Sequence, residues 1–135
     1  MLVQAGERVF SRLGLAAMLV SAVLWVVFSA FRGIVTVSAA DEMTSTGAVP
    51  GYYESLAKWG FTLFYIYAVL GFLALAAYGV SQLQVTLLPL WVGWATMVFS
   101  MGLLILLFIM GDTLPAFHYV PDLLIGILLL LSSPR

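Results

Sequence analysis

Residues 87–110 read LLPLWVGWATMVFSMGLLILLFIM and contain no charged side chain. A helix of about 20 apolar residues is long enough to cross a hydrocarbon core of roughly 30 Å. Pro89 lies near the start of the stretch, where a missing backbone N–H costs little. Trp91 and Trp94 follow, and tryptophan collects at the boundary between membrane and water. The stretch therefore predicts a membrane-spanning helix.

The composition of the whole chain supports the same fold class. Of its 135 residues, 64% are hydrophobic and 8% are charged, whereas soluble domains carry about 25% charged residues. The five Lys and Arg residues and the net charge of −1 argue against a nucleic-acid partner, which needs clustered basic side chains. The absence of cysteine excludes disulfides and thiolate metal sites. We expect an all-α integral membrane protein.

Three further apolar stretches complete the predicted fold. We predict one domain over residues 1–135, a four-transmembrane-helix antiparallel bundle with spans at about residues 13–36, 59–80, 87–110 and 114–131. Residues 41–58 are polar and contain turn residues at 44–47 and 50–51, which predicts an outer loop of roughly 20 residues. Residues 81–86 predict a short turn, so the second and third spans should form an antiparallel hairpin.

The first span has an alternative interpretation as a secretory signal peptide. A basic lead precedes the apolar run, and residues 37–40 are small enough for a signal peptidase. The apolar run is longer than the usual hydrophobic region of a signal peptide. We therefore favour a retained helix.

Small residues recur along the second and third spans. Ala68, Gly71 and Ala74 lie three positions apart, and the third span carries a matching face of small and hydroxyl residues at Gly93, Thr96 and Ser100. Such stripes allow two helices to approach closely. We interpret them as helix-packing surfaces rather than as a ligand site.

Lys and Arg near the ends of the spans predict the orientation in the membrane. Arg8, Arg12 and Arg135 fall on the side of the N-terminus, the 81–86 turn and the C-terminus, and Arg32 and Lys58 fall on the other side. The larger basic count predicts that both termini are cytoplasmic.

Residues 88–94, LPLWVGW, resemble a recurring segment of uncharacterised bacterial multi-pass membrane proteins. That segment typically reads Pro-Arg-Trp-Leu-Gly-Trp at the entrance of a span, and Leu90 stands here in place of the arginine. The resemblance implies a bacterial origin, and hence a plasma membrane location, and no activity.

Ionisable residues within spans are costly and are the default candidates for function. Arg32 and Asp122 meet this criterion, and His118 lies four residues before Asp122, on the same helix face. In the predicted topology, the residues that reach the non-cytoplasmic end are Arg32, Asp112, His118, Asp122, Tyr65 and Tyr67.

Two interpretations of this set remain open. The residues could line a polar pocket that binds a lipid headgroup or another amphipathic ligand, or that passes a proton. Alternatively, Arg32 and Asp122 form an ion pair that neutralises two buried charges, and His118 lies at the headgroup boundary. The second interpretation needs no ligand, and we favour it.

We predict no cofactor and no bound metal. A buried b-type haem usually takes two axial ligands, and His118 is the single histidine of the chain. The many aromatic residues are ordinary at membrane interfaces and do not indicate a pigment. HExxH, GxGxxG and phosphate-loop motifs are absent from the sequence, so we lean towards a non-enzymatic protein.

The function expected from these features is that of an accessory or scaffold subunit of a membrane complex. The alternative is a small ligand-binding or transport protein that uses the polar pocket and oligomerises to form a path. A small membrane enzyme ranks last. The expected partners are the lipid bilayer and other membrane subunits, or further copies of this chain, and not nucleic acid.

Overall fold

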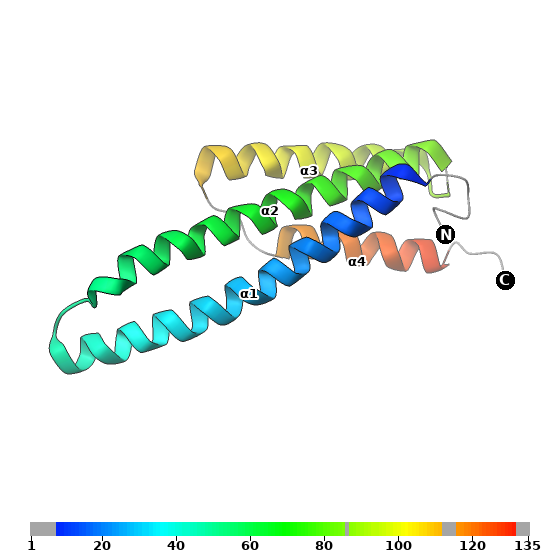
Figure 1. Ribbon diagram of the computed structural model, residues 1–135. Helices are drawn as coiled ribbons and strands as arrows, with labels where there is room; N and C mark the ends of the chain where they lie inside the picture. The colour runs from blue at the N-terminus through cyan, green and yellow to red at the C-terminus, as the bar shows by residue number, and fades with distance from the viewer. Residues whose placement is uncertain (1–7, 86, 112–115, 132–135) are drawn as a thin grey trace.

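The computed structural model describes residues 8–85, 87–111 and 116–131, and these residues form four α-helices (Figure 1). They are α1 (Val9–Thr46), α2 (Gly51–Val85), α3 (Leu90–Met110) and α4 (Ala116–Leu131). By length and composition, α1, α2 and α3 could each span a membrane. The predicted all-α class is therefore confirmed, with three helices of spanning length.

The fourth predicted span is shorter than expected. Helix α4 has 16 residues with Pro121 inside it, and its described apolar stretch, Tyr119–Leu128, is shorter still. Sixteen residues extend about 24 Å, which is less than the roughly 30 Å hydrocarbon core. The structure thus establishes a fourth apolar helix but not a fourth span.

The predicted outer loop over residues 41–58 is wrong. Helix α1 continues through Thr46 and α2 begins at Gly51, so the link between them is confined to residues 47–50. The hydroxyls of Thr44 and Thr46 donate to the carbonyl oxygens of Ala40 and Glu42, both at 2.8 Å, so these turn-forming residues satisfy their hydroxyl groups within the helix. Gly47 then ends α1 in the left-handed conformation, with φ of 73°.

The connection between α2 and α3 also begins later than predicted, because residues 81–85 remain helical. Gln82 is buried in α2, and its side-chain amide lies against the backbone of Leu87 and Leu88. Pro89 precedes α3, as the sequence indicated. The predicted antiparallel pairing of the second and third spans is confirmed, since α2 packs along α3 (Figure 1).

Helix α2 is the centre of the described fold. It packs against α1 and α3 over much of its length and less extensively against α4. Among the described residues, the backbone of α1 approaches neither α3 nor α4, and the side chains of Trp25 and Tyr119 bridge α1 and α4, with ring centroids 6.3 Å apart. The other three helices therefore pack around α2, and the four helices do not form a closed four-helix bundle.

The predicted small-residue faces are the helix-packing surfaces. Ala68, Gly71 and Ala74 of α2 are buried, and the α3 face of Gly93, Thr96 and Ser100 is buried as well. On α1, the buried positions Gly14, Ser21 and Phe28 repeat every seven residues, which is the spacing of a left-handed helix pair. The main apolar core lies beside them and comprises Phe28, Phe64, Tyr67, Ala68, Phe72, Leu103 and Leu107.

Helices α1 and α2 extend well past the end of α3 (Figure 1). The hydroxyl of Tyr65 donates to the carbonyl oxygen of Gly111 at 2.9 Å, which fixes the end of α3 beside Tyr65. The part of α2 that precedes Tyr65 extends about 21 Å beyond the end of α3, and it packs against the last part of α1. We call this segment, residues 29–64, the overhang.

Candidate functional site

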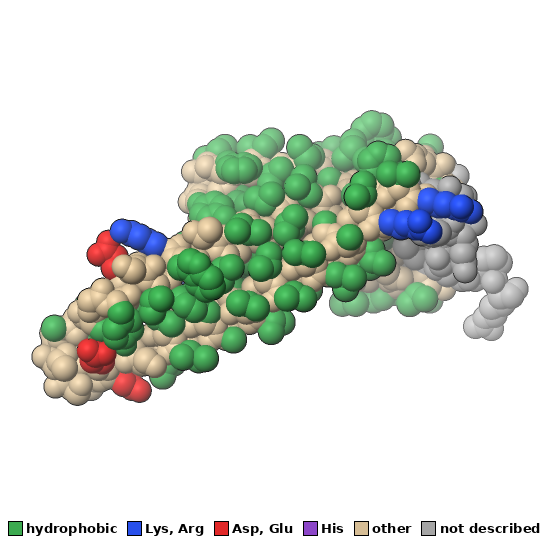
Figure 2. Space-filling view, in the orientation of Figure 1, with side chains coloured by type: hydrophobic (Ala, Val, Ile, Leu, Met, Phe, Trp, Pro, Cys, Tyr) green, Lys and Arg blue, Asp and Glu red, His purple; other side chains and the backbone are tan. Residues whose placement is uncertain are grey.

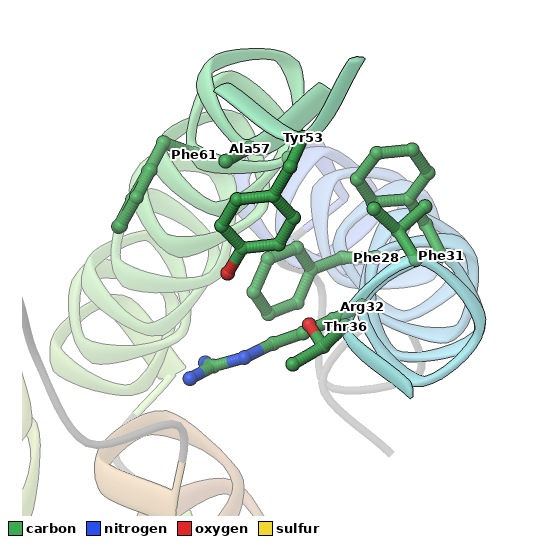
Figure 3. A pocket seen from close by; sticks show the side chains of 9 residues that line it. Phe28, Phe31, Arg32, Thr36, Tyr53, Ala57 and Phe61 are labelled. Atoms are coloured by element: carbon green, nitrogen blue, oxygen red, sulfur yellow. The ribbon is translucent and has the colours of Figure 1, made fainter. Parts of the chain in front are cut away.

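A notch opens between α1 and α2 at the base of the overhang (Figure 3). Its volume is about 100 Å³. One basic side chain, two hydroxyl groups and several aromatic rings surround it: the lining residues are Phe28, Phe31, Arg32, Val35, Thr36, Tyr53, Ala57, Gly60 and Phe61.

The two helices meet closely at the notch because α2 has a glycine there. A Cβ atom at Gly60 would lie 2.9 Å from the ring of Phe31, and Phe31 also stacks edge-on with Trp59 at 5.2 Å. Figure 3 shows Arg32 of α1 and Tyr53 of α2 reaching into the space beside the Phe28 ring. Thr36 lies one turn after Arg32 on the same face of α1.

Arg32 has no acidic partner among the described residues. The ion pair among the described residues joins Glu54 and Lys58 instead, at 2.8 Å, within one turn of α2. No carboxylate of the described residues lines the notch, and the Arg32 side chain is exposed. Within the described part of the chain, the notch therefore presents a positive charge without an acidic partner, beside the rings of Phe28, Phe31 and Phe61.

Asp122 lies in a different part of the structure. Tyr119, one turn before it on α4, lies beside Ser21 and Trp25 of α1, and Asp122 itself is within electrostatic range of Tyr78 of α2. Both carboxylate oxygens are buried, and neither has a hydrogen-bond partner among the described residues.

The predicted ion pair between Arg32 and Asp122 is therefore not formed. Arg32 shares its notch with Gly60, and roughly 27 Å of α2 separates Gly60 from Tyr78, near Asp122. The prediction assigned both charges to one end of the bundle because it treated α4 as a full span starting level with Arg32. Helix α4 instead runs back alongside the part of α2 that follows Tyr65 (Figure 1).

The two tyrosines of the predicted pocket serve the packing of the helices. Tyr65 binds the carbonyl oxygen that ends α3, as described above. Tyr67 is completely buried in the main core, with its ring 5.0 Å from Trp25 and 5.3 Å from Phe64. Neither tyrosine lines the notch.

The side chains of the remaining two predicted site residues, Asp112 and His118, are not among those that the structure describes. Asp112 is not among the described residues, and His118 lies in α4 with no described side chain. The sequence interpretation that placed them with Arg32 and Asp122 stays a prediction.

Of the nine residues that line the notch, Arg32 alone was among the predicted site residues, and the sequence analysis did not identify the others, which include Thr36, Tyr53 and Ala57. Thr36 follows Arg32 by four positions, and Tyr53, Ala57 and Gly60 follow one another at helical spacing. That spacing was a usable signal, but residues 41–58 were interpreted as a loop, which removed the helix face that carries Tyr53 and Ala57.

Comparison with protein-family models, with curated proteins and with solved structures finds no match for this chain.

Proposed function

We propose that this chain is a non-enzymatic integral membrane protein that serves as an accessory or scaffold subunit of a larger membrane complex. The observation that carries the proposal is the overhang. Helix α3 has 21 residues, about 31 Å, which matches the hydrocarbon core. A membrane matched to α3 leaves much of the overhang outside the lipid tails.

The overhang nevertheless exposes apolar side chains. Val37 is 59% exposed and Val49 is 61% exposed, and Met43 between them is exposed as well. Single exposed apolar residues are ordinary on protein surfaces, but lipid tails cannot cover these three side chains beyond the headgroups. A neighbouring subunit would bury them.

The distribution of charge supports the proposed orientation. Arg8 and Arg12 lie at one end of the molecule, and Asp41 and Glu42 lie near the tip of the overhang (Figure 2). Basic residues favour the cytoplasmic side, so we propose that the start of α1 and the end of α4 face the cytoplasm. The proposal treats α4 as a fourth, short span and places the protein in a bacterial plasma membrane.

The alternative function, a ligand-binding or transport protein with one polar pocket, has weaker support. It requires Arg32 and Asp122 to face a common cavity, and these residues lie in separate regions. A membrane enzyme is supported less still, because the described part of the chain assembles no pair of groups suited to acid and base chemistry.

The test is purification from native membranes in mild detergent, followed by native mass spectrometry. We expect the wild-type chain to co-purify with a different chain. Val37→Glu should reduce the recovered partner at least about tenfold, since it introduces a charge into the apolar contact. Ser38→Glu is the matched control, because it adds the same charge at an exposed polar position. Recovery of the chain alone, or of a homo-oligomer only, contradicts the proposal.

A further inference from the structure

We propose that the notch at Arg32 binds a phosphate group, carried either by a membrane lipid or by a free anion. The inference does not depend on the accessory-subunit proposal. It rests on the depth of the notch in the membrane, its charge, its hydrogen-bond donors and its size.

The depth of the notch follows from two contacts already described. The end of α3 lies beside Tyr65, and the α2 residues that line the notch run from Phe61 back to Tyr53. At 1.5 Å per residue, they lie about 6–18 Å past the end of α3. The headgroup layer on each side of a hydrocarbon core is roughly 5–8 Å thick, so a membrane matched to α3 places the inner end of the notch, at Phe61 and Gly60, at the level of lipid phosphates.

The charge of the notch favours an anion. Among the residues that the structure describes, no carboxylate lines it, and Lys58, the basic residue that follows on α2, is paired with Glu54. Arg32 lies beside Phe28 and a hydroxyl from each helix (Figure 3).

The donors of the notch suit a phosphate. A guanidinium offers paired N–H groups that match two phosphate oxygens, and such bonds are about twice as strong as neutral ones. The hydroxyls of Thr36 and Tyr53 border the same space and can donate to a third oxygen. The aromatic wall of Phe28, Phe31 and Phe61 suits the start of an acyl chain.

The size of the notch limits the ligand. A volume of about 100 Å³ exceeds the space that one water needs and falls below the roughly 300 Å³ of the smallest pockets for drug-sized molecules. The notch therefore has room for one oxyanion.

The experiment measures lipid binding to the full-length protein by native mass spectrometry. Phosphatidylglycerol is titrated against diacylglycerol, which has the same chains and no phosphate. Arg32→Gln removes the charge, and Arg32→Lys keeps the charge without the paired donors. Arg12→Gln is the matched control, since it removes an exposed arginine from the opposite end of α1. Helix content by circular dichroism is required to stay unchanged in each variant.

We expect phosphatidylglycerol to bind the wild-type protein more tightly than diacylglycerol, with a loss of about tenfold in Arg32→Gln and a smaller loss in Arg32→Lys. Arg12→Gln should bind like the wild type. Addition of inorganic phosphate separates the two sources: displacement of the lipid at millimolar phosphate indicates a free anion, and persistence of the lipid indicates a headgroup. Equal binding of both lipids, or unchanged binding in Arg32→Gln, overturns the inference.

Discussion

Gly79 of α2 and Gly93 of α3 meet backbone to backbone. A Cβ atom at Gly79 would lie 2.9 Å from the carbonyl oxygen of Gly93, and a Cβ atom at Gly93 would lie 3.1 Å from the carbonyl oxygen of Gly79. Neither carbonyl can move without disturbing its own helix. The approach of α2 and α3 therefore depends on both residues lacking a side chain.

Gly79→Ala is expected to destabilise the protein by about 1–3 kcal/mol, because the added methyl group forces the two helices apart. Thermal unfolding in detergent measures the effect. Gly102→Ala on α3 is the control, since nothing lies within 4 Å of its Cβ position; its better helix propensity should leave stability unchanged or raise it by up to about 1 kcal/mol. Similar unfolding temperatures for both variants would contradict the close approach.

Ser21→Ala is expected to weaken the interface between α1 and α2. The Ser21 hydroxyl is buried and donates across the interface to the Tyr67 carbonyl oxygen at 2.8 Å. Bonds of this kind in membrane proteins contribute about 0.6 kcal/mol on average and up to about 1.7 kcal/mol, and a loss in this range should appear in chemical unfolding. Thr62→Ala removes an exposed bond within α2 and should change little.

Tyr65→Phe is expected to loosen the end of α3. The substitution removes the bond to the Gly111 carbonyl oxygen and keeps the ring, at a cost of about 0.5–1.5 kcal/mol. Hydrogen exchange should accelerate at the last turn of α3 and remain unchanged in the first turns. Tyr53→Phe, in the overhang, serves as the control. Uniform exchange along α3 in Tyr65→Phe would show that this bond does not hold the helix end.

Asp122→Asn is expected to leave stability in detergent unchanged or to raise it. Substitution of a carboxylate that has a partner would break that interaction and lower stability. The Asp122 oxygens are buried, and they have no hydrogen-bond partner among the described residues. A charge at the centre of an apolar helix costs about 2.5–3.5 kcal/mol, so Asp122→Leu should stabilise the protein further, by about 1–3 kcal/mol.

The same substitution also tests the pairing with Arg32 that the sequence suggested. The effects of Asp122→Asn and Arg32→Gln should add within about 0.5 kcal/mol, since distant sites behave independently. A strong loss of stability in Asp122→Asn, together with coupling to Arg32→Gln, would restore the ion pair.

The helices and their contact faces were readable from the sequence because they follow local rules. The uncharged run from Leu87 onward, with Pro89 at its start, gave the position of α3 within a few residues. The spacing of Ala68, Gly71 and Ala74 identified the buried face of α2, since helix periodicity maps sequence directly onto faces.

The errors in the sequence interpretation arose where a residue type has two uses. Thr44, Ser45 and Thr46 form turns readily, but their hydroxyls here bond back to carbonyls of the preceding helical turn. The chain stays helical to Thr46 and becomes helical again at Gly51, so Tyr53 lies on a helix that packs along α1 and lines the notch with Arg32. The separation of Arg32 from Asp122 depends on which part of α2 lies alongside α4. Tertiary packing sets that position, and sequence spacing does not reveal it.

The central position of α2 bears on how the chain reaches its native state during synthesis. The contacts of α1 are made mainly with the helix that follows it directly, so that hairpin can be completed while α3 is still inside the ribosome. Later helices then add to a surface that already exists.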